Sequence, residues 1–260
     1  MRTLVSKVGS ASIAVLAMVL VGTAYAAGGG GKPASGTDIA NGKSIFDNGK
    51  GDVPACSGCH GNDGLGNDVM RTPRLAGQLY QFLVKQLDDY ANDRRQDNTM
   101  FVMNANAKGL SEQDRRDVSS YLNSLANTQP GTHLNQPSGT GSDVVALKEN
   151  GTEVGAAHIG KILVNYGVPE RGIPACRACH GFNGRGVDPM YPKIGEQKFT
   201  YLVDQLKKFR DGERANDPLG QMRVVAEKLE DEDILNVATY LTQAPPTTVG
   251  NTRIPAEYLP

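Results

Sequence analysis

Apolar residues recur at helical spacing in several stretches of the 260-residue chain. The positions i, i+3, i+4, i+7, i+8 and i+11 hold Leu79, Phe82, Leu83, Gln86, Leu87 and Tyr90, which places them on one face of a helix. Ser111 and Asp114 form a capping-box pattern that predicts the start of a terminal helix, whose apolar stripe is Val118, Tyr121, Leu122 and Leu125. No stretch sustains the period of two that is typical of strands. The pattern therefore predicts an all-α protein.

The pattern occurs twice, because the second half of the chain resembles the first at an offset of 118 to 120 residues. The matched segments are Gly42-Lys43 with Gly160-Lys161, residues 73–78 with 192–197, 83–87 with 202–206, and 110–122 with 229–241. An internal repeat of this kind predicts two copies of one small helical domain.

Segments rich in Gly, Pro, Ser and Thr separate the two copies and flank them. We therefore expect a signal peptide at 1–26, a flexible segment at 27–37, a first domain at 38–127, a linker at 128–156, a second domain at 157–243 and a Pro-rich tail at 244–260. Within the linker, the run from 143 to 148 is expected to form a short ordered segment.

The N-terminus has the three parts of a secretory signal peptide. These are the cations Arg2 and Lys7, an apolar run from Ile13 to Val21, and the cleavage pattern Ala24-Tyr25-Ala26. A retained membrane anchor is the alternative, although the apolar run is shorter than the ~20 residues that span a bilayer. The pattern predicts cleavage after Ala26 and export to the periplasm.

Charge is nearly balanced, with 27 Lys and Arg residues against 28 Asp and Glu residues. The chain therefore lacks the excess of basic residues that would indicate a nucleic-acid partner.

Two copies of the pattern C-x-x-C-H carry the candidate chemistry, and they use all four cysteines of the chain. They are Cys56-Ser57-Gly58-Cys59-His60 and Cys176-Arg177-Ala178-Cys179-His180. In c-type haem attachment, the two thiols form thioethers with the haem vinyl groups and the histidine supplies a nitrogen ligand to the iron. Zinc binding, two disulfides and a redox-active dithiol are the alternatives. The pattern predicts two covalently bound haem c groups.

Each iron needs a second axial ligand, and two similar domains should supply it from matching positions. Met103 follows His60 by 43 residues, and Met222 follows His180 by 42 residues. Methionine sulfur favours ferrous iron and raises the reduction potential. The alternatives are the matched pair Met70 and Met190, which we expect to pack against the haem, the unmatched Met100, and the histidines His133 and His158.

The chain resembles the dihaem cytochromes c4 over about residues 38–243. The resemblance rests on the doubled C-x-x-C-H, the P-x-L-x-G-Q type run and the L-x-x-Q-L type helix that follow each motif, the segment from Arg214 to Met222, and the closing helices. It implies two tandem class I cytochrome c domains, His/Met ligation of both haems and one-electron transfer between respiratory complexes. It also implies that Pro73 and Pro192 accept hydrogen bonds from the Nδ1–H groups of His60 and His180.

Three functions fit this resemblance. The first is a non-enzymatic electron carrier, with a quinol-oxidising cytochrome bc complex as donor and a terminal oxidase or other reductase as acceptor. Peripheral association with the membrane is an open alternative for such a carrier. The second is a dihaem electron-transfer subunit of a larger dehydrogenase, for example with a flavoprotein partner. The third is a dihaem enzyme such as a peroxidase.

Overall fold

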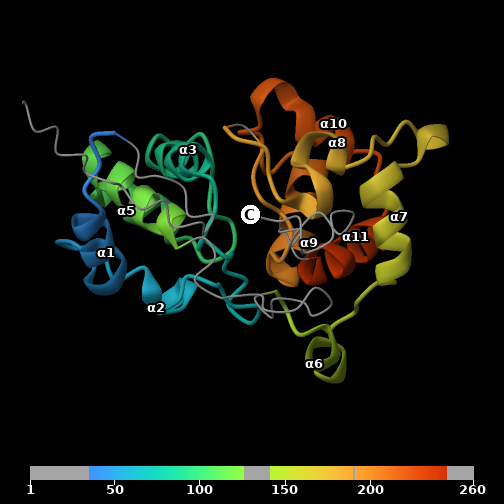
Figure 1. Cartoon of the computed structure of the whole chain (residues 1–260), viewed down its shortest axis with the longest axis horizontal. Helices are drawn as coiled ribbons and strands as arrows, with labels where there is room; N and C mark the ends of the chain where they lie inside the picture. The colour runs from blue at the N-terminus through green and yellow to red at the C-terminus, as the bar shows by residue number, and fades with distance from the viewer. Residues whose placement is uncertain (1–34, 126–140, 190, 245–260) are drawn as a thin grey trace, which may run out of the picture.

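The computed structural model describes residues 35–125, 141–189 and 191–244. Two helical domains of similar architecture lie side by side (Figure 1). In the described part of the chain, the β-type pairing is limited to four isolated bridges, for example Asn67 with Thr72. The expected all-α class is confirmed.

The first domain is built from five helices: α1 (Ile39–Asn48), α2 (Ser57–His60), α3 (Tyr80–Ala91), α4 (Met103–Gly109) and α5 (Glu112–Ser124). Helix α5 packs across α1 and α3, and α4 packs against α3. The predicted stripe of α5 lies in the core, where Val118, Tyr121 and Leu122 contact Phe46 of α1 and its neighbours. The capping box of Ser111 and Asp114 is present as predicted.

The second domain repeats this arrangement with α7 (Ala157–Tyr166), α8 (Arg177–His180), α9 (Phe199–Arg210), α10 (Gln221–Ala226) and α11 (Asp231–Gln243). Three short 3-10 helices accompany them: η1 (Pro169–Arg171), η2 (Phe182–Gly184) and η3 (Pro218–Gly220). Helix α11 crosses α7 and α9, as α5 crosses α1 and α3. The core includes Val164, Phe199 and Leu241.

Part of the predicted linker belongs to the second domain. The run expected to be ordered forms α6 (Val144–Glu149), whose N-terminus is capped by the Asp143 side chain. Just before it, the Ser142 amide donates to Thr242 Oγ1 (2.7 Å) and the Ser142 hydroxyl accepts from the Phe199 amide (2.7 Å). The predicted signal peptide lies outside the described residues, as do most of the flexible segment and of the tail. No helix in the described ranges is long and apolar enough to span a membrane.

One pair of matched glycines, Gly42 and Gly160, allows close helix packing in both copies. A Cβ atom on Gly42 would lie 2.1 Å from the backbone oxygen of Asp117, and one on Gly160 would lie 1.9 Å from that of Asn236. Both distances are far shorter than a van der Waals contact, so only glycine allows α1 and α7 to approach the terminal helices this closely. This crossing fixes the start of each domain relative to its last helix.

Candidate haem-binding site

Each C-x-x-C-H motif forms a single helical turn, α2 in the first domain and α8 in the second. The amide of His60 donates to the carbonyl of Cys56 (3.0 Å), and that of His180 donates to the carbonyl of Cys176 (2.9 Å). One turn therefore holds both cysteines and the histidine of each motif together. Both histidines are buried.

The ring orientation of each histidine is set by a backbone carbonyl. Nδ1 of His60 lies 3.1 Å from the carbonyl oxygen of Pro73, and Nδ1 of His180 lies 2.9 Å from that of Pro192. Because a carbonyl only accepts, Nδ1 carries the proton and Nε2 presents a lone pair. Burial lowers the pKa of both imidazoles, which favours this neutral, metal-binding form.

None of the four cysteines is paired in a disulfide within the described residues, unlike the disulfide alternative. Burial raises the pKa of Cys56 and of Cys176 to about 11. The described residues contain no cluster of three or more His, Cys, Asp or Glu that could hold a metal ion. The site therefore fits an apolar group attached through the sulfurs better than a zinc ion.

A cavity of about 970 Å³ connects the two motifs. All four cysteines, His60 and His180 line it, together with the helix face predicted from Phe82 to Tyr90. This volume lies at the upper end of the range for small-molecule sites. The apolar face of α3 is thus partly buried against the cavity instead of against protein, which is where haem would pack.

The candidate sixth ligands also line the cavity. Met103 and Met222 lie on it, and so do Met70 and Met100, while His158 does not. Met190 and His133 lie outside the described residues. The structure therefore brings both members of the Met103 and Met222 pair to the same cavity as the histidines.

Aspartates form hydrogen bonds with the chain around these methionines. The carboxylate of Asp97 accepts hydrogen bonds from the amides of Thr99, Met100, Val102 and Met103 at 3.0 to 3.2 Å. Burial alone would raise the pKa of Asp97, but these amides outweigh it and lower the pKa. In the second domain, Asp217 accepts from the amide and the guanidinium of Arg223. The sequence pattern includes both aspartates but does not predict these hydrogen bonds.

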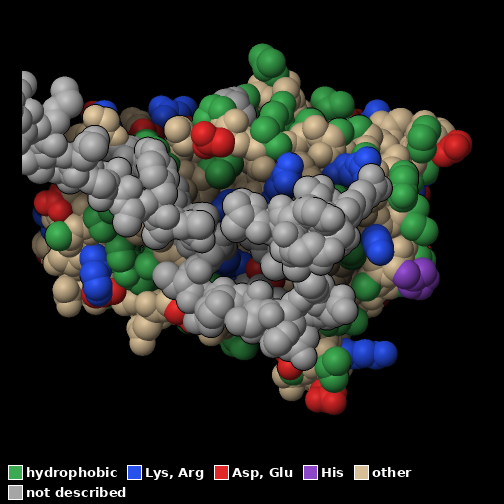
Figure 2. Space-filling model, in the orientation of Figure 1, with side chains coloured by type: hydrophobic (Ala, Val, Ile, Leu, Met, Phe, Trp, Pro, Cys, Tyr) green, Lys and Arg blue, Asp and Glu red, His purple; other side chains and the backbone are tan. Residues whose placement is uncertain are grey.

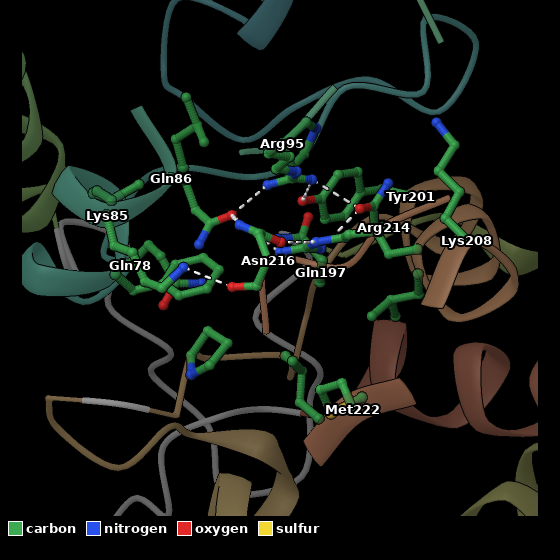
Figure 3. Close-up of a pocket in the computed structure, with 18 of the residues that line it drawn as sticks. Gln78, Lys85, Gln86, Arg95, Gln197, Tyr201, Lys208, Arg214, Asn216 and Met222 are labelled. Carbon is green, nitrogen blue, oxygen red and sulfur yellow. Dashed lines mark hydrogen bonds between the residues drawn. The ribbon is translucent and has the colours of Figure 1, made fainter. Parts of the chain in front are cut away.

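Two buried arginines meet between the domains (Figure 3). Arg95 and Arg214 are only 5 % and 8 % exposed. Each donates to both Gln86 and Gln205, at 2.7 to 3.0 Å, and Arg95 also donates to the Tyr201 hydroxyl (3.1 Å). Each guanidinium also lies over an aromatic ring of its own domain.

Within the described ranges, neither of these guanidinium groups forms an ion pair with a carboxylate. Burial, and next the charge of Arg95, lower the pKa of Arg214 to about 10. Burial alone would lower the pKa of Arg95, but the neighbouring Tyr201 and Tyr90 outweigh it and raise the pKa, so both groups are cations at neutral pH. Two buried cations facing one cavity require anions nearby. The propionates of haem would supply them, so the residues present fit that group.

A symmetric set of hydrogen bonds joins the domains beside the cavity. Gln78 accepts from the amide of Lys193 (2.9 Å) and donates to its carbonyl (2.8 Å). At the matching place, Gln197 accepts from the amide of Arg74 (2.7 Å) and donates to its carbonyl (3.0 Å). The repeat matches both glutamines, but their role at the interface was not predicted, because polar residues matched in two copies do not reveal which of them is buried.

Comparisons with known proteins agree with this geometry. The cytochrome c family model matches residues 39–126 and 173–245. A thiosulfate dehydrogenase electron acceptor from Thiomonas intermedia is 34% identical over 75% of this chain and 80% of its own length. A cytochrome c4 from Thiocapsa roseopersicina is 34% identical over 81% of this chain and 92% of its own length.

Two solved structures are similar. Reduced recombinant cytochrome c4 from Pseudomonas stutzeri superposes with a TM-score of 0.61 at 30% identity, covering 80% of this chain and 99% of that one. A thiosulfate dehydrogenase from Marichromatium purpuratum gives 0.67 at 28% identity over 86% of this chain, which spans only 44% of that protein. The chain therefore belongs to the cytochrome c family, among the cytochromes c4, and carries two covalently bound haem c groups.

Proposed function

We propose that this protein carries single electrons between redox proteins of the periplasm through two haems with His/Met ligation. The thioethers form at Cys56 and Cys59 for one haem and at Cys176 and Cys179 for the other, and the axial ligands are His60 with Met103 and His180 with Met222. The observation that carries the proposal is the single cavity that all eight side chains line.

Bound haem supplies an iron that alternates between the ferrous and ferric states. The side chains of the chain set the conditions for that change. The carbonyls of Pro73 and Pro192 hold the imidazoles in the tautomer that ligates through Nε2. Met103 and Met222 would each supply a sulfur, which favours ferrous iron, and the buried arginines Arg95 and Arg214 would neutralise the propionates.

A protein with both irons six-coordinate has no open position for substrate, so we propose a carrier and not an enzyme such as a peroxidase. The proposed donor is a quinol-oxidising cytochrome bc complex, and the proposed acceptor is a terminal oxidase or another reductase. The periplasmic location rests on the signal-peptide pattern that ends at Ala26.

Carbon monoxide distinguishes a carrier from an enzyme. Added to the fully reduced protein at neutral pH, it should leave the absorption of both haems unchanged, because methionine occupies the sixth position of each iron. A redox titration of the same sample should show two positive potentials. Binding of carbon monoxide at either haem would favour the enzyme instead.

A second candidate is the electron acceptor of a dehydrogenase, and the relatives named as thiosulfate dehydrogenase electron acceptors favour it. The two candidates differ in the electron donor. A purified thiosulfate dehydrogenase supplied with thiosulfate should reduce the protein at a catalytic rate if this candidate is correct. Reduction only by quinol with a cytochrome bc complex would exclude it.

A further inference from the structure

One surface of the second domain is apolar where the first domain is polar. Four side chains from α7 and η2 define this surface, which we call the α7 face: Ile159, Ile162, Tyr166 and Phe182. Their exposed fractions are 37%, 55%, 71% and 45%. Helix α7 contacts both α8 and η2, so these residues lie on neighbouring elements. Hydrophobic side chains are visible along the edge of the molecule that α7 forms (Figure 2).

The repeat provides an internal comparison for the α7 face. Its four positions correspond in the first domain to Asn41, Ser44, Asn48 and Asn62. Both domains share the same core packing and the same haem motif, so the fold itself does not require apolar residues at these places. A contiguous exposed apolar surface of this kind marks an interaction site.

The residues around the α7 face are also more positively charged than the matching residues of the first domain. The first domain has Asp47, Ser57, Asp63 and Leu65, and the second has Asn165, Arg177, Asn183 and Arg185 at the matching positions. The formal charge of these four positions is −2 in the first domain and +2 in the second. Arg177 lies 5.9 Å from the centre of the Tyr166 ring, so this cation borders the apolar side chains directly.

The cations at the rim are available to a partner. Within the part of the chain that the structure describes, Lys161, Arg177 and Arg185 form no ion pair, and all three are exposed. The exposed carboxylates nearest to them along the chain are Glu153, Glu170 and Asp188. An apolar centre with a mainly cationic rim is complementary to a surface with an apolar centre and an acidic rim.

The α7 face lies beside the haem motif of its domain. Cys179 is exposed, whereas Cys59 at the matching position is partly buried. A haem attached through Cys179 would therefore present that edge to the surface next to α7. A partner seated on the α7 face would be placed against that edge.

We propose that the α7 face is the docking surface for an acidic redox protein, which exchanges electrons with the haem of the second domain and not with that of the first. This inference rests on the proposed electron-carrier function. It assigns the two domains different partners, because the matching positions of the first domain lack the four apolar side chains and the cations Arg177 and Arg185.

An acidic plant plastocyanin is a suitable probe, since its docking surface joins an apolar patch to carboxylates. Its cadmium-substituted form cannot exchange electrons, so the affinity for the full-length dihaem protein is measured separately from electron transfer. The test variant is Ile162→Ser with Tyr166→Asn, which installs the residues of the first domain. The second variant is Arg177→Ser. Val145→Ser is the matched control, because Val145 is an exposed apolar residue on α6.

The double variant and Arg177→Ser should each bind the probe about five- to thirty-fold more weakly, as expected for residues at the centre of an interface. Val145→Ser should bind as the parent does. The affinity of the parent should also fall with rising salt, and that of Arg177→Ser should fall less steeply.

Two binding results would overturn the proposal: equal affinity of the double variant and the parent for the probe, or no binding of the probe by the parent. A third would be self-association of the parent in sedimentation that the double variant abolishes, because the occupant of the α7 face would then be a second copy of the chain. Unchanged haem spectra show that the variants are folded. A failure of the carrier function would appear instead as carbon monoxide binding in the parent, independently of the affinities.

Discussion

At the scale of single residues, the buried guanidinium of Arg214 has consequences for the haem potential. It lies in the cavity wall with Arg95, and its hydrogen bonds within the described residues go to neutral acceptors. Its charge is therefore not cancelled by a protein carboxylate. A cation close to a haem favours the ferrous state, which carries one positive charge fewer than the ferric state.

We predict that Arg214→Gln lowers the potential of at least one haem. At an effective dielectric constant near 20 and a separation on the order of 10 Å, one charge contributes about 1–2 kcal/mol. For one electron this corresponds to roughly 40–85 mV. Arg214→Lys keeps the charge and should recover most of the potential. Arg210→Gln, outside the cavity, is the control. A redox titration in which Arg214→Gln matches the parent would show that this charge does not reach either iron.

At the scale of helices, the crossings of α1 with α5 and of α7 with α11 depend on one glycine each. We predict that Gly42→Ala and Gly160→Ala destabilise their domains by about 1–3 kcal/mol, because the added methyl group overpacks the crossing. Gly58 is the control, since a Cβ there meets nothing within 4 Å and Ala178 occupies the matching position. Guanidinium unfolding followed by circular dichroism measures the effect. Equal midpoints for Gly42→Ala and Gly58→Ala would contradict the close approach.

The capping box of α5 predicts a dependence of stability on pH. Burial alone would raise the pKa of Asp114, but hydrogen bonds from Lys50, Ser111 and Asn41 outweigh it and lower the pKa to about 2. Because this pKa is below that of the unfolded chain, the stabilisation is complete above about pH 4 and is lost as the pH falls through about 2.

We expect this carboxylate to contribute about 2 kcal/mol of unfolding free energy above pH 4. Asp114→Asn should remove most of that contribution at neutral pH and flatten the stability profile between about pH 4 and pH 2. Glu112→Gln, on the exposed side of the same helix, is the matched variant. An Asp114→Asn profile that runs parallel to that of the parent would be inconsistent with the folded pKa.

Sequence patterns predicted the helices, the capping box and the candidate ligands, because each depends on spacing within one copy. The stripe of Val118, Tyr121 and Leu122 follows directly from helical geometry. The roles of Arg95 and Gln78 could not be predicted in this way. Their burial results from contact with the other copy, and a polar residue in a single domain is expected at the surface.

At the scale of the whole molecule, the symmetric glutamines hold two haem sites in one cavity. The Gln78→Ala and Gln197→Ala double variant leaves four backbone groups without these partners, at a cost of about 1–3 kcal/mol for each one that stays buried. We predict that the domains separate, which should increase the radius of gyration in small-angle X-ray scattering while each haem spectrum is kept. Gln243→Ala, exposed on α11, is the control. Identical scattering from the double variant and the control would show that other contacts suffice.

The most direct test of His/Met ligation is the ferric charge-transfer band that methionine-ligated haem displays. In the full-length dihaem protein, Met103→Leu and Met222→Leu should each remove about half of this band, and the two together should abolish it, because each iron loses its sulfur ligand. Met70→Leu should leave the band intact, since Met70 is assigned to packing against the haem. A band that survives in Met103→Leu but is halved in Met70→Leu would contradict the ligation proposed for the first haem.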